Sequence, residues 1–176
     1  MSIELVFETH STTEDNERGV ATGWHAGKLS AAGREQARQM GQRRGNDGVD
    51  AIFTSDLARA IETVRIAFPD AAVPVFMDWR LRECDYGEMT GMHPDMLELA
   101  EHIDVPYPAG ESQRQAVERV GWFVRALRAR RDWSRLLIVG HVATWWGLEH
   151  SINGTPLEAL VTTPFEWQEG WEYRLN

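Results

Sequence analysis

The chain has little cysteine, no excess of basic residues and no long apolar run. One of its 176 residues is cysteine, Cys84, so no disulfide can form within the chain. Nothing in the sequence demands an oxidising compartment, so a reducing, cytoplasmic setting is expected. No stretch approaches the roughly 18 consecutive apolar residues of a membrane span, and the first residues do not follow the pattern of a secretion signal. Membrane association is therefore not expected.

The balance of charge is acidic, with a net charge of −9. Nucleic-acid-binding proteins usually present a basic face, so no nucleic-acid partner is expected. A small phosphorylated ligand remains compatible with this charge, because a local arginine can hold a phosphate through paired hydrogen bonds. The length and the 43 % hydrophobic content predict one domain over residues 1–176 with a single core. The oligomeric state is left open, with a homodimer as one alternative to a monomer.

Short β-rich segments alternate with longer helical segments along the chain. Strands are expected at 3–7, 51–55, 73–77, 135–140 and, as an edge or near-edge strand, 169–175. Helices are expected at 31–46 after a Ser30 cap, from caps at Ser55 or Asp56 to Phe68, and at 93–103, 111–130 and 143–152. This alternation predicts an α/β fold, a three-layer sandwich with helices on both faces of a mostly parallel sheet. In such sheets the ligand site lies beyond the carboxyl ends of the strands.

Four reactive side chains follow the ends of these strands. His10 follows the first strand and His141 follows the strand at 135–140. Arg59 lies early in the helix behind the second strand, and Glu83 lies in the loop behind the third. Each residue alone is more often structural or solvated than functional. The four together are expected to meet in one cleft, because a parallel sheet gathers its carboxyl ends at one edge.

This set of side chains suits one kind of chemistry. An imidazole can act as a nucleophile and form a covalent intermediate, and a guanidinium can hold phosphoryl oxygens. A glutamic acid with a raised pKa can protonate a leaving oxygen, and a second imidazole can donate to developing charge. The set therefore predicts phosphoryl transfer through a phosphohistidine, with no metal or organic cofactor. The remaining histidines lack a spacing that favours a metal site, namely His25, His93, His102 and His150.

Ordered motifs along the chain support the same interpretation. They are Thr-His-Ser at 9–11 with Asn16 six residues after the histidine, "GW" at 23–24, "LSAAGREQA", "SDLARA", "LRECDYGEMTG", "GES" at 110–112 and "VGH" at 139–141. In these motifs the chain resembles the histidine phosphatase superfamily, with its phosphoglycerate-mutase-like fold, and especially its small bacterial branch. The resemblance implies that His10 is the nucleophile, Glu83 the acid and His141 the second catalytic histidine. It also implies phosphate binding by Arg59, with Asn16 as a supporting match.

The first motif departs from the family pattern. Thr9 and Ser11 stand where the resemblance predicts arginine and glycine, and Glu8 precedes them where an apolar residue is usual. Each lost charge-assisted hydrogen bond is worth roughly 1.5–3 kcal/mol. At ~1.4 kcal/mol per factor of ten, the missing arginine is expected to slow turnover about tenfold to several hundredfold. Glu8 would repel phosphate further, unless the alternation of side chains along the strand turns it to the opposite face.

Three functional hypotheses follow from this departure. In the first, Thr9 and Ser11 donate neutral hydrogen bonds and Arg18 or Lys28 reaches in, so that the protein hydrolyses a small phosphorylated metabolite. In the second, the fold binds a phosphorylated ligand as a low-activity or inactive regulatory protein. In the third, hydrolysis is kept for a substrate that depends less on a second arginine. A mutase is less expected, because the chain looks too short for the segments that would hold a bisphosphorylated substrate.

Overall fold

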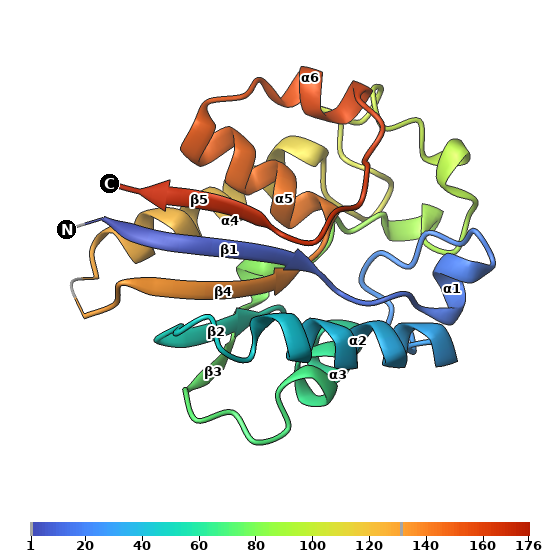
Figure 1. Cartoon of the computed structure of the whole chain (residues 1–176). Helices are drawn as coiled ribbons and strands as arrows, with labels where there is room; N and C mark the ends of the chain where they lie inside the picture. Colours follow the sequence, from blue (N-terminus) through green and yellow to red (C-terminus); the bar gives the residue numbers. More distant parts are fainter. Residues whose placement is uncertain (1, 131) are drawn as a thin grey trace.

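The computed structural model describes residues 2–130 and 132–176 and contains a five-stranded sheet in the order β3-β2-β4-β1-β5 (Figure 1). The strands are β1 (Ile3–Thr9), β2 (Ala51–Thr54), β3 (Val75–Met77), β4 (Arg135–Gly140) and β5 (Trp171–Leu175). The first four pair in parallel, and β5 adds to β1 as an antiparallel edge. The prediction of a mostly parallel sheet with an edge strand at the carboxyl end of the chain is confirmed.

Helices cover both faces of this sheet, as the alternation of segments predicted. α2 (Ala31–Arg44) and α3 (Ala58–Ala67) lie on one face, while α4 (Gln113–Arg128) and α5 (Val142–Leu148) lie on the other (Figure 1). The strands bury side chains on both sides: Val6 packs in the cluster with residues of α2 and α3, and Phe7 packs with residues of α4. This three-layer arrangement leaves the carboxyl ends of β1, β2 and β4 at one end of the molecule.

Shorter elements complete the chain around that end. They are α1 (Glu14–Glu17), 3₁₀ turns at Trp79–Leu81, Gly87–Met89 and Pro94–Leu97, a π-helical turn at Glu149–Asn153 and α6 (Leu157–Thr162). Within the described ranges, no helix has both the length and the apolar composition that a membrane crossing requires.

Two local predictions are wrong. The helix expected at 93–103 ends after one turn, because Glu98 takes a left-handed conformation with φ of 45° that a helix cannot continue through. The helix expected to be capped by Ser55 or Asp56 begins at Ala58, and its N-cap residue is Leu57, which provides no side-chain cap. Both polar residues have other partners, since Ser55 contacts His141 and Asp56 pairs with an arginine. By contrast, the Ser30 cap is confirmed, with its hydroxyl accepting from the Gly33 amide at 3.1 Å.

The Glu8 carboxylate is held by two arginines at the end of α2. It is fully buried, and it accepts hydrogen bonds from Arg43 at 3.1 and 2.9 Å and from Arg44 at 2.8 Å. Arg44 also donates to the carbonyl of Glu169, 2.8 Å away, and so connects the segment before β5 to β1. The negative charge of Glu8 is thus balanced inside the protein. Its role here is to join β1, α2 and the segment before β5.

Replacing Glu8 with alanine is expected to lower the free energy of unfolding by about 3 kcal/mol, because two arginines lose a buried partner. Chemical denaturation measures this change. Glu35→Ala is a matched control: Glu35 pairs with Arg38 while both side chains are 57 % exposed, so its loss should cost less than about 1 kcal/mol. Equal losses in the two variants would contradict a structural role for Glu8.

Candidate active site

His10 lies directly beyond the carboxyl end of β1. Its amide donates to the carbonyl of Gly140 at 2.8 Å, which extends the pairing of β1 with β4 by one residue. Its Nδ1 lies 2.8 Å from the carbonyl of Ser11. A carbonyl only accepts, so Nδ1 carries the proton and Nε2 keeps its lone pair. Desolvation and the nearby Arg59 lower the pKa of His10 to about 3, so the ring is a neutral nucleophile at neutral pH.

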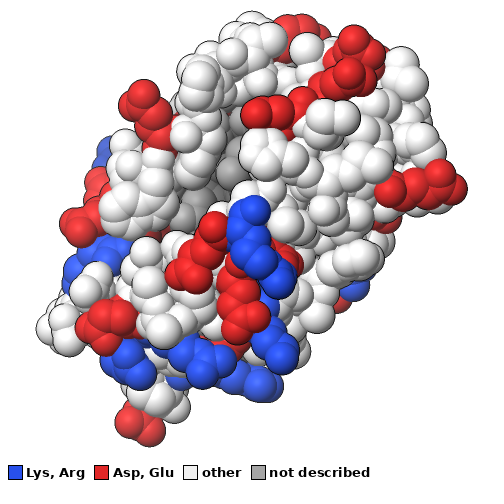
Figure 2. All heavy atoms as spheres, turned by 90° about the vertical axis from the view of Figure 1, so that its right-hand side faces the viewer, with Lys and Arg blue, Asp and Glu red and all other residues white. Residues whose placement is uncertain are grey.

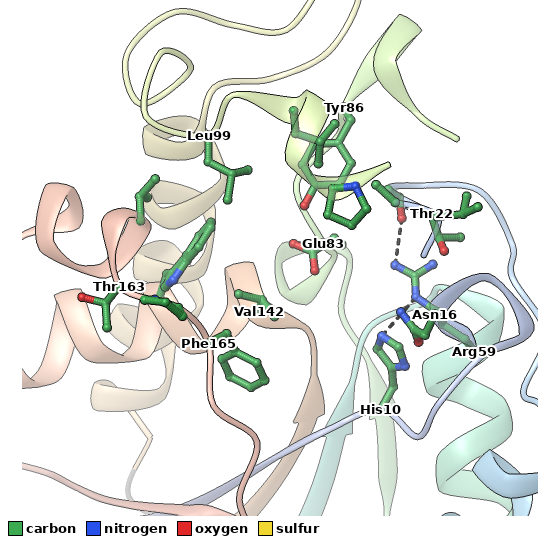
Figure 3. Close-up of a pocket in the computed structure, with 18 of the residues that line it drawn as sticks. His10, Asn16, Thr22, Arg59, Glu83, Tyr86, Leu99, Val142, Thr163 and Phe165 are labelled. Atoms are coloured by element: carbon green, nitrogen blue, oxygen red, sulfur yellow. Dashed lines mark hydrogen bonds between the residues drawn. The ribbon is translucent and has the colours of Figure 1, made fainter. Parts of the chain in front are cut away.

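Arg59, in the first turn of α3, contacts both catalytic histidines predicted from the sequence. Its Nε lies 3.4 Å from Nε2 of His10, and its Nη2 lies 3.4 Å from Nδ1 of His141. The remaining hydrogen bonds hold the guanidinium in place, through the carbonyls of Gly23 at 2.8 Å and His25 at 2.9 Å. Figure 3 shows the guanidinium beside the His10 ring at the edge of the cavity. The arginine is 2 % exposed, so its charge is directed into the site rather than into solvent.

His141 is the N-cap residue of α5. Its ring is tilted by 53° relative to the His10 ring, with 5.0 Å between the ring centroids. Its Nε2 lies 2.7 Å from the hydroxyl oxygen of Ser55. That oxygen also accepts from the Leu57 amide at 3.3 Å, and the hydroxyl can still accept from Nε2 or donate to it. Arg59 can only donate, so in its contact with His141 the Nδ1 atom accepts from Nη2, and Nε2 carries the ring proton toward Ser55. An anion bound here would replace this contact and accept from Arg59, and it would also accept from Nδ1 once the ring proton moves there and Nε2 accepts from the Ser55 hydroxyl.

Glu83 is 9 % exposed and offers one free oxygen to the site. Its Oε1 accepts from the amides of Cys84 at 2.8 Å and Ala143 at 3.2 Å, while Oε2 has no hydrogen-bond partner among the described residues. Burial raises the pKa of this carboxyl group, and the attraction of Arg59 opposes that rise only in part. The geometry thus suits a carboxylic acid that gives up a proton from Oε2.

The turn at Gly23 and Trp24 positions two of these groups. Gly23 has φ of +49°, and a Cβ there would lie 3.1 Å from the Tyr86 ring, so glycine is needed for its carbonyl to reach Arg59. The indole Nε1 of Trp24 donates to the backbone carbonyl of Glu83 at 2.7 Å. Sequence reasoning recognised this "GW" pair as a motif and assigned it no role. It also missed the contact of Ser55 with His141, because the hydroxyl was expected to cap a helix.

A cavity of about 440 Å³ brings these groups to one surface. His10, Arg59 and Glu83 line it together with Asn16, which forms a capping box with Thr13 at the start of α1 and accepts from the Thr13 amide and hydroxyl at 3.0 and 2.8 Å. Figure 2 looks onto this end of the molecule and shows a hollow surrounded by many uncharged side chains with acidic and basic ones nearby. Three of the four residues predicted from strand ends therefore line this cavity, and the fourth, His141, contacts Arg59 beside it.

Thr9 and Ser11 lie on the other side of the nucleophile. They line a neighbouring cavity of about 640 Å³, which shares His10 and Glu83 with the first one. The Ser11 amide is already used, since it donates to the Thr63 hydroxyl at 3.1 Å. Both residues thus lie next to His10. The short side chain of Thr9 fills less of the 640 Å³ cavity than an arginine side chain would.

The structure does not bring Arg18 into the site. Its Nη2 lies 2.5 Å from Asp15 Oδ1, and its side chain is 67 % exposed. Among the described residues that line the 440 Å³ cavity, Arg59 is the single arginine or lysine, so Lys28 is also outside it. The position of Arg18 is explained by the Asp15 carboxylate, which pairs with its guanidinium outside the cavity. In the part of the chain that the structure describes, no three histidine, cysteine or acidic side chains gather as metal ligands would.

Comparison with known proteins agrees with this geometry. The family model for the histidine phosphatase superfamily (branch 1) matches residues 5–167. A 2,3-bisphosphoglycerate-dependent phosphoglycerate mutase of Parvibaculum lavamentivorans is 33 % identical over 154 residues, which cover 78 % of this chain and 73 % of that protein. A protein of the same description from Neisseria meningitidis serogroup B is 38 % identical, with 99 % and 95 % covered. The match to Phosphoglycerate mutase 1 of Saccharomyces cerevisiae, 40 % identical over 93 residues, spans only 38 % of the yeast protein.

Solved structures give the same result for the fold. Bacillus stearothermophilus YhfR superposes with a TM-score of 0.85 and 27 % identity, covering 97 % of this chain and 90 % of that one. The alpha-ribazole phosphatase from Shigella flexneri superposes with a TM-score of 0.79 and 27 % identity, covering 90 % and 83 %. The similarity therefore extends over nearly the whole sheet and its helices.

Proposed function

The chain belongs to branch 1 of the histidine phosphatase superfamily, and from this premise we propose that it hydrolyses a small phosphomonoester through a phosphohistidine at His10. One observation carries the proposal: the Arg59 guanidinium contacts Nε2 of His10 and Nδ1 of His141, and His10, Arg59 and Glu83 line one cavity. Similar proteins are described as mutases and as phosphatases, and both kinds of enzyme move phosphoryl groups.

In the first step, Nε2 of His10 attacks phosphorus and the bond from phosphorus to the leaving oxygen breaks. Arg59 donates to the phosphoryl oxygens, and His141 donates to them from Nδ1 while its Nε2 accepts from the Ser55 hydroxyl. Glu83 gives its proton to the leaving oxygen, so the product departs as a neutral alcohol. The carbonyl of Ser11 stabilises the positive charge that the His10 ring gains, because it already accepts from Nδ1.

In the second step, the Glu83 carboxylate takes a proton from water, and the water oxygen attacks phosphorus. The bond from phosphorus to Nε2 breaks, inorganic phosphate leaves, and His10 and protonated Glu83 are restored. The same carboxyl group thus serves as acid and then as base. This double use requires that the pKa of Glu83 be higher than that of an exposed glutamate, which burial provides.

Steady-state release of inorganic phosphate tests the proposal, with p-nitrophenyl phosphate and a panel of other phosphomonoesters as substrates. The regulatory alternative predicts a different result from the same panel, namely binding of a phosphomonoester by calorimetry without release of phosphate. That alternative is motivated by Thr9 and by the single cationic side chain lining the described part of the cavity. Phosphate release above that of a His10→Ala preparation decides for the enzyme.

The Thr9→Arg variant is expected to raise kcat/KM about tenfold or more, because it adds charge-assisted hydrogen bonds beside Arg59. Steady-state kinetics with p-nitrophenyl phosphate measure the gain. Ser2→Arg is the matched control, since it adds the same charge before the amino end of β1, at an exposed position. An unchanged rate for Thr9→Arg would show that the native site already supplies what the missing arginine gives, and would contradict the idea of an impaired phosphate site.

A further inference from the structure

Beyond the reacting groups, the 440 Å³ cavity is apolar. Figure 3 shows Leu99, Val142 and Phe165 across the cavity from Glu83 and His10. The wall opposite the reacting groups consists mainly of Leu97, Leu99, Val142, Trp146, Val161 and Phe165. Polar side-chain atoms on this side are uncharged, such as the Thr163 hydroxyl and the Trp146 indole Nε1, which has no hydrogen-bond partner among the described residues.

This wall is built from segments that are far apart in the sequence. Leu97 and Leu99 flank the left-handed Glu98 and come from the segment where a longer helix was expected. Val161 comes from α6, and Trp146 comes from α5. Leu97, Trp146 and Val161 are buried members of one hydrophobic cluster, so the core supports the wall. The apolar surface is thus formed before a ligand binds.

Charge in the cavity is confined to the reacting end. Among the described lining residues, Arg59 and Glu83 are the side chains with a formal charge, and both are assigned to the transferred phosphoryl group and its leaving oxygen. Arg43 lines the neighbouring cavity, but it already donates two hydrogen bonds to Glu8. A second anionic group on the leaving alcohol would enter an apolar space without a cation to receive it. Such burial of an unpaired charge is strongly unfavourable.

We propose that the substrate is a phosphomonoester of an uncharged, mainly apolar alcohol or phenol, such as an aryl or branched alkyl phosphate. The inference rests on the proposed function and assigns a substrate class to the same site. The leaving group packs against the apolar wall. The hydroxyl of Thr163 can form a hydrogen bond with an uncharged polar substituent on that leaving group. Phosphoglycerates and other substrates with a second phosphate or a carboxylate are disfavoured, and so is a mutase reaction on them.

A comparison of substrates tests this inference on the unmodified protein. We expect kcat/KM for 1-naphthyl phosphate to exceed that for 3-phosphoglycerate at least about 100-fold. An equal or higher kcat/KM for 3-phosphoglycerate would overturn the assigned substrate class. Labelling with radiolabelled acetyl phosphate, which has a very small leaving group, separates the two proposals. Label on His10 without an aromatic preference rejects the substrate class alone, whereas absence of both label and turnover rejects the function and the substrate class together.

A charge placed in the wall gives a second test. Leu99 is partly exposed at the cavity, so Leu99→Arg should fold and is expected to lower kcat/KM for 1-naphthyl phosphate about tenfold while raising that for 3-phosphoglycerate. Val105→Arg is the matched control, because Val105 is 59 % exposed outside the cavity and should leave both values unchanged. If Leu99→Arg leaves the ratio of the two substrates as it was, the wall does not contact the leaving group and the inference fails.

Discussion

Replacing His10 with alanine is expected to reduce phosphate release at least about 10⁴-fold, because the covalent route is lost together with the nucleophile. The neighbouring groups are poor replacements, because Nδ1 of His141 accepts from Arg59 and Glu83 has a raised pKa that favours its protonated form. Steady-state release from p-nitrophenyl phosphate measures the loss. Far-ultraviolet circular dichroism and thermal unfolding show whether the variant keeps its fold.

The matched control for this prediction is His150→Ala. His150 is exposed, lines neither described cavity and contacts the carbonyl of Thr155 at 2.9 Å. Its replacement is expected to leave turnover within about twofold. A folded His10→Ala protein that keeps a tenth or more of the activity would show that another group attacks phosphorus.

Replacing Glu83 with glutamine is expected to lower kcat about 10²- to 10⁴-fold, the range that general acid–base catalysis supplies. The amide oxygen can still accept from Cys84 and Ala143, so the loop should keep its shape while the exchangeable proton is lost. The loss should be larger for an alkyl phosphate than for p-nitrophenyl phosphate, because p-nitrophenolate leaves without protonation. A purely structural role for Glu83 would lower the rates of both substrates equally.

The pH dependence gives the same prediction a second readout. Burial raises the pKa of Glu83, so its protonated fraction, needed for the first step, falls as the pH rises through that value. The wild-type kcat/KM should therefore decline on the alkaline side, and Glu83→Gln should lack this decline. His10 has a pKa of about 3, so its protonation should reduce the rate only near that pH. Glu88→Gln, at an exposed position in the same loop region, should keep the wild-type profile.

The sheet and the reactive residues were predictable because both follow from strand ends. Parallel strands bring their carboxyl ends to one edge, so the sequence predicts that the reactive residues lie near one another. In the structure His10, Arg59 and Glu83 line one cavity, and His141 contacts Arg59. The sequence allowed two orientations of the Glu8 side chain, toward the cleft or toward the opposite face of the sheet. Glu8 is buried against Arg43 because α2 ends where it does. Sequence periodicity locates the end of a helix only to within one or two residues, so it does not predict this contact.

The supporting contacts were not predictable in the same way. Ser55, Trp24 and the apolar wall act through partners that lie far away in the sequence, and local patterns contain no information on such pairs. The segment after Pro94 has a helical pattern, yet the left-handed Glu98 ends the helix and brings Leu97 and Leu99 to the cavity. Arg18 was a reasonable replacement for the missing arginine by its position, but Asp15 is three residues away and pairs with it.

The proposed reaction requires a covalent phosphoryl group at His10. Mixing the protein with a radiolabelled phosphomonoester, quenching within the first turnovers and digesting the chain measures this intermediate. The expected result is label that is stable in base and labile in acid, confined to the peptide containing His10 and absent from His10→Ala. Label should accumulate in Glu83→Gln with acetyl phosphate, because its departing group needs no proton while breakdown needs the base. Phosphate release by wild-type protein with no label on His10 under any of these conditions would contradict the account.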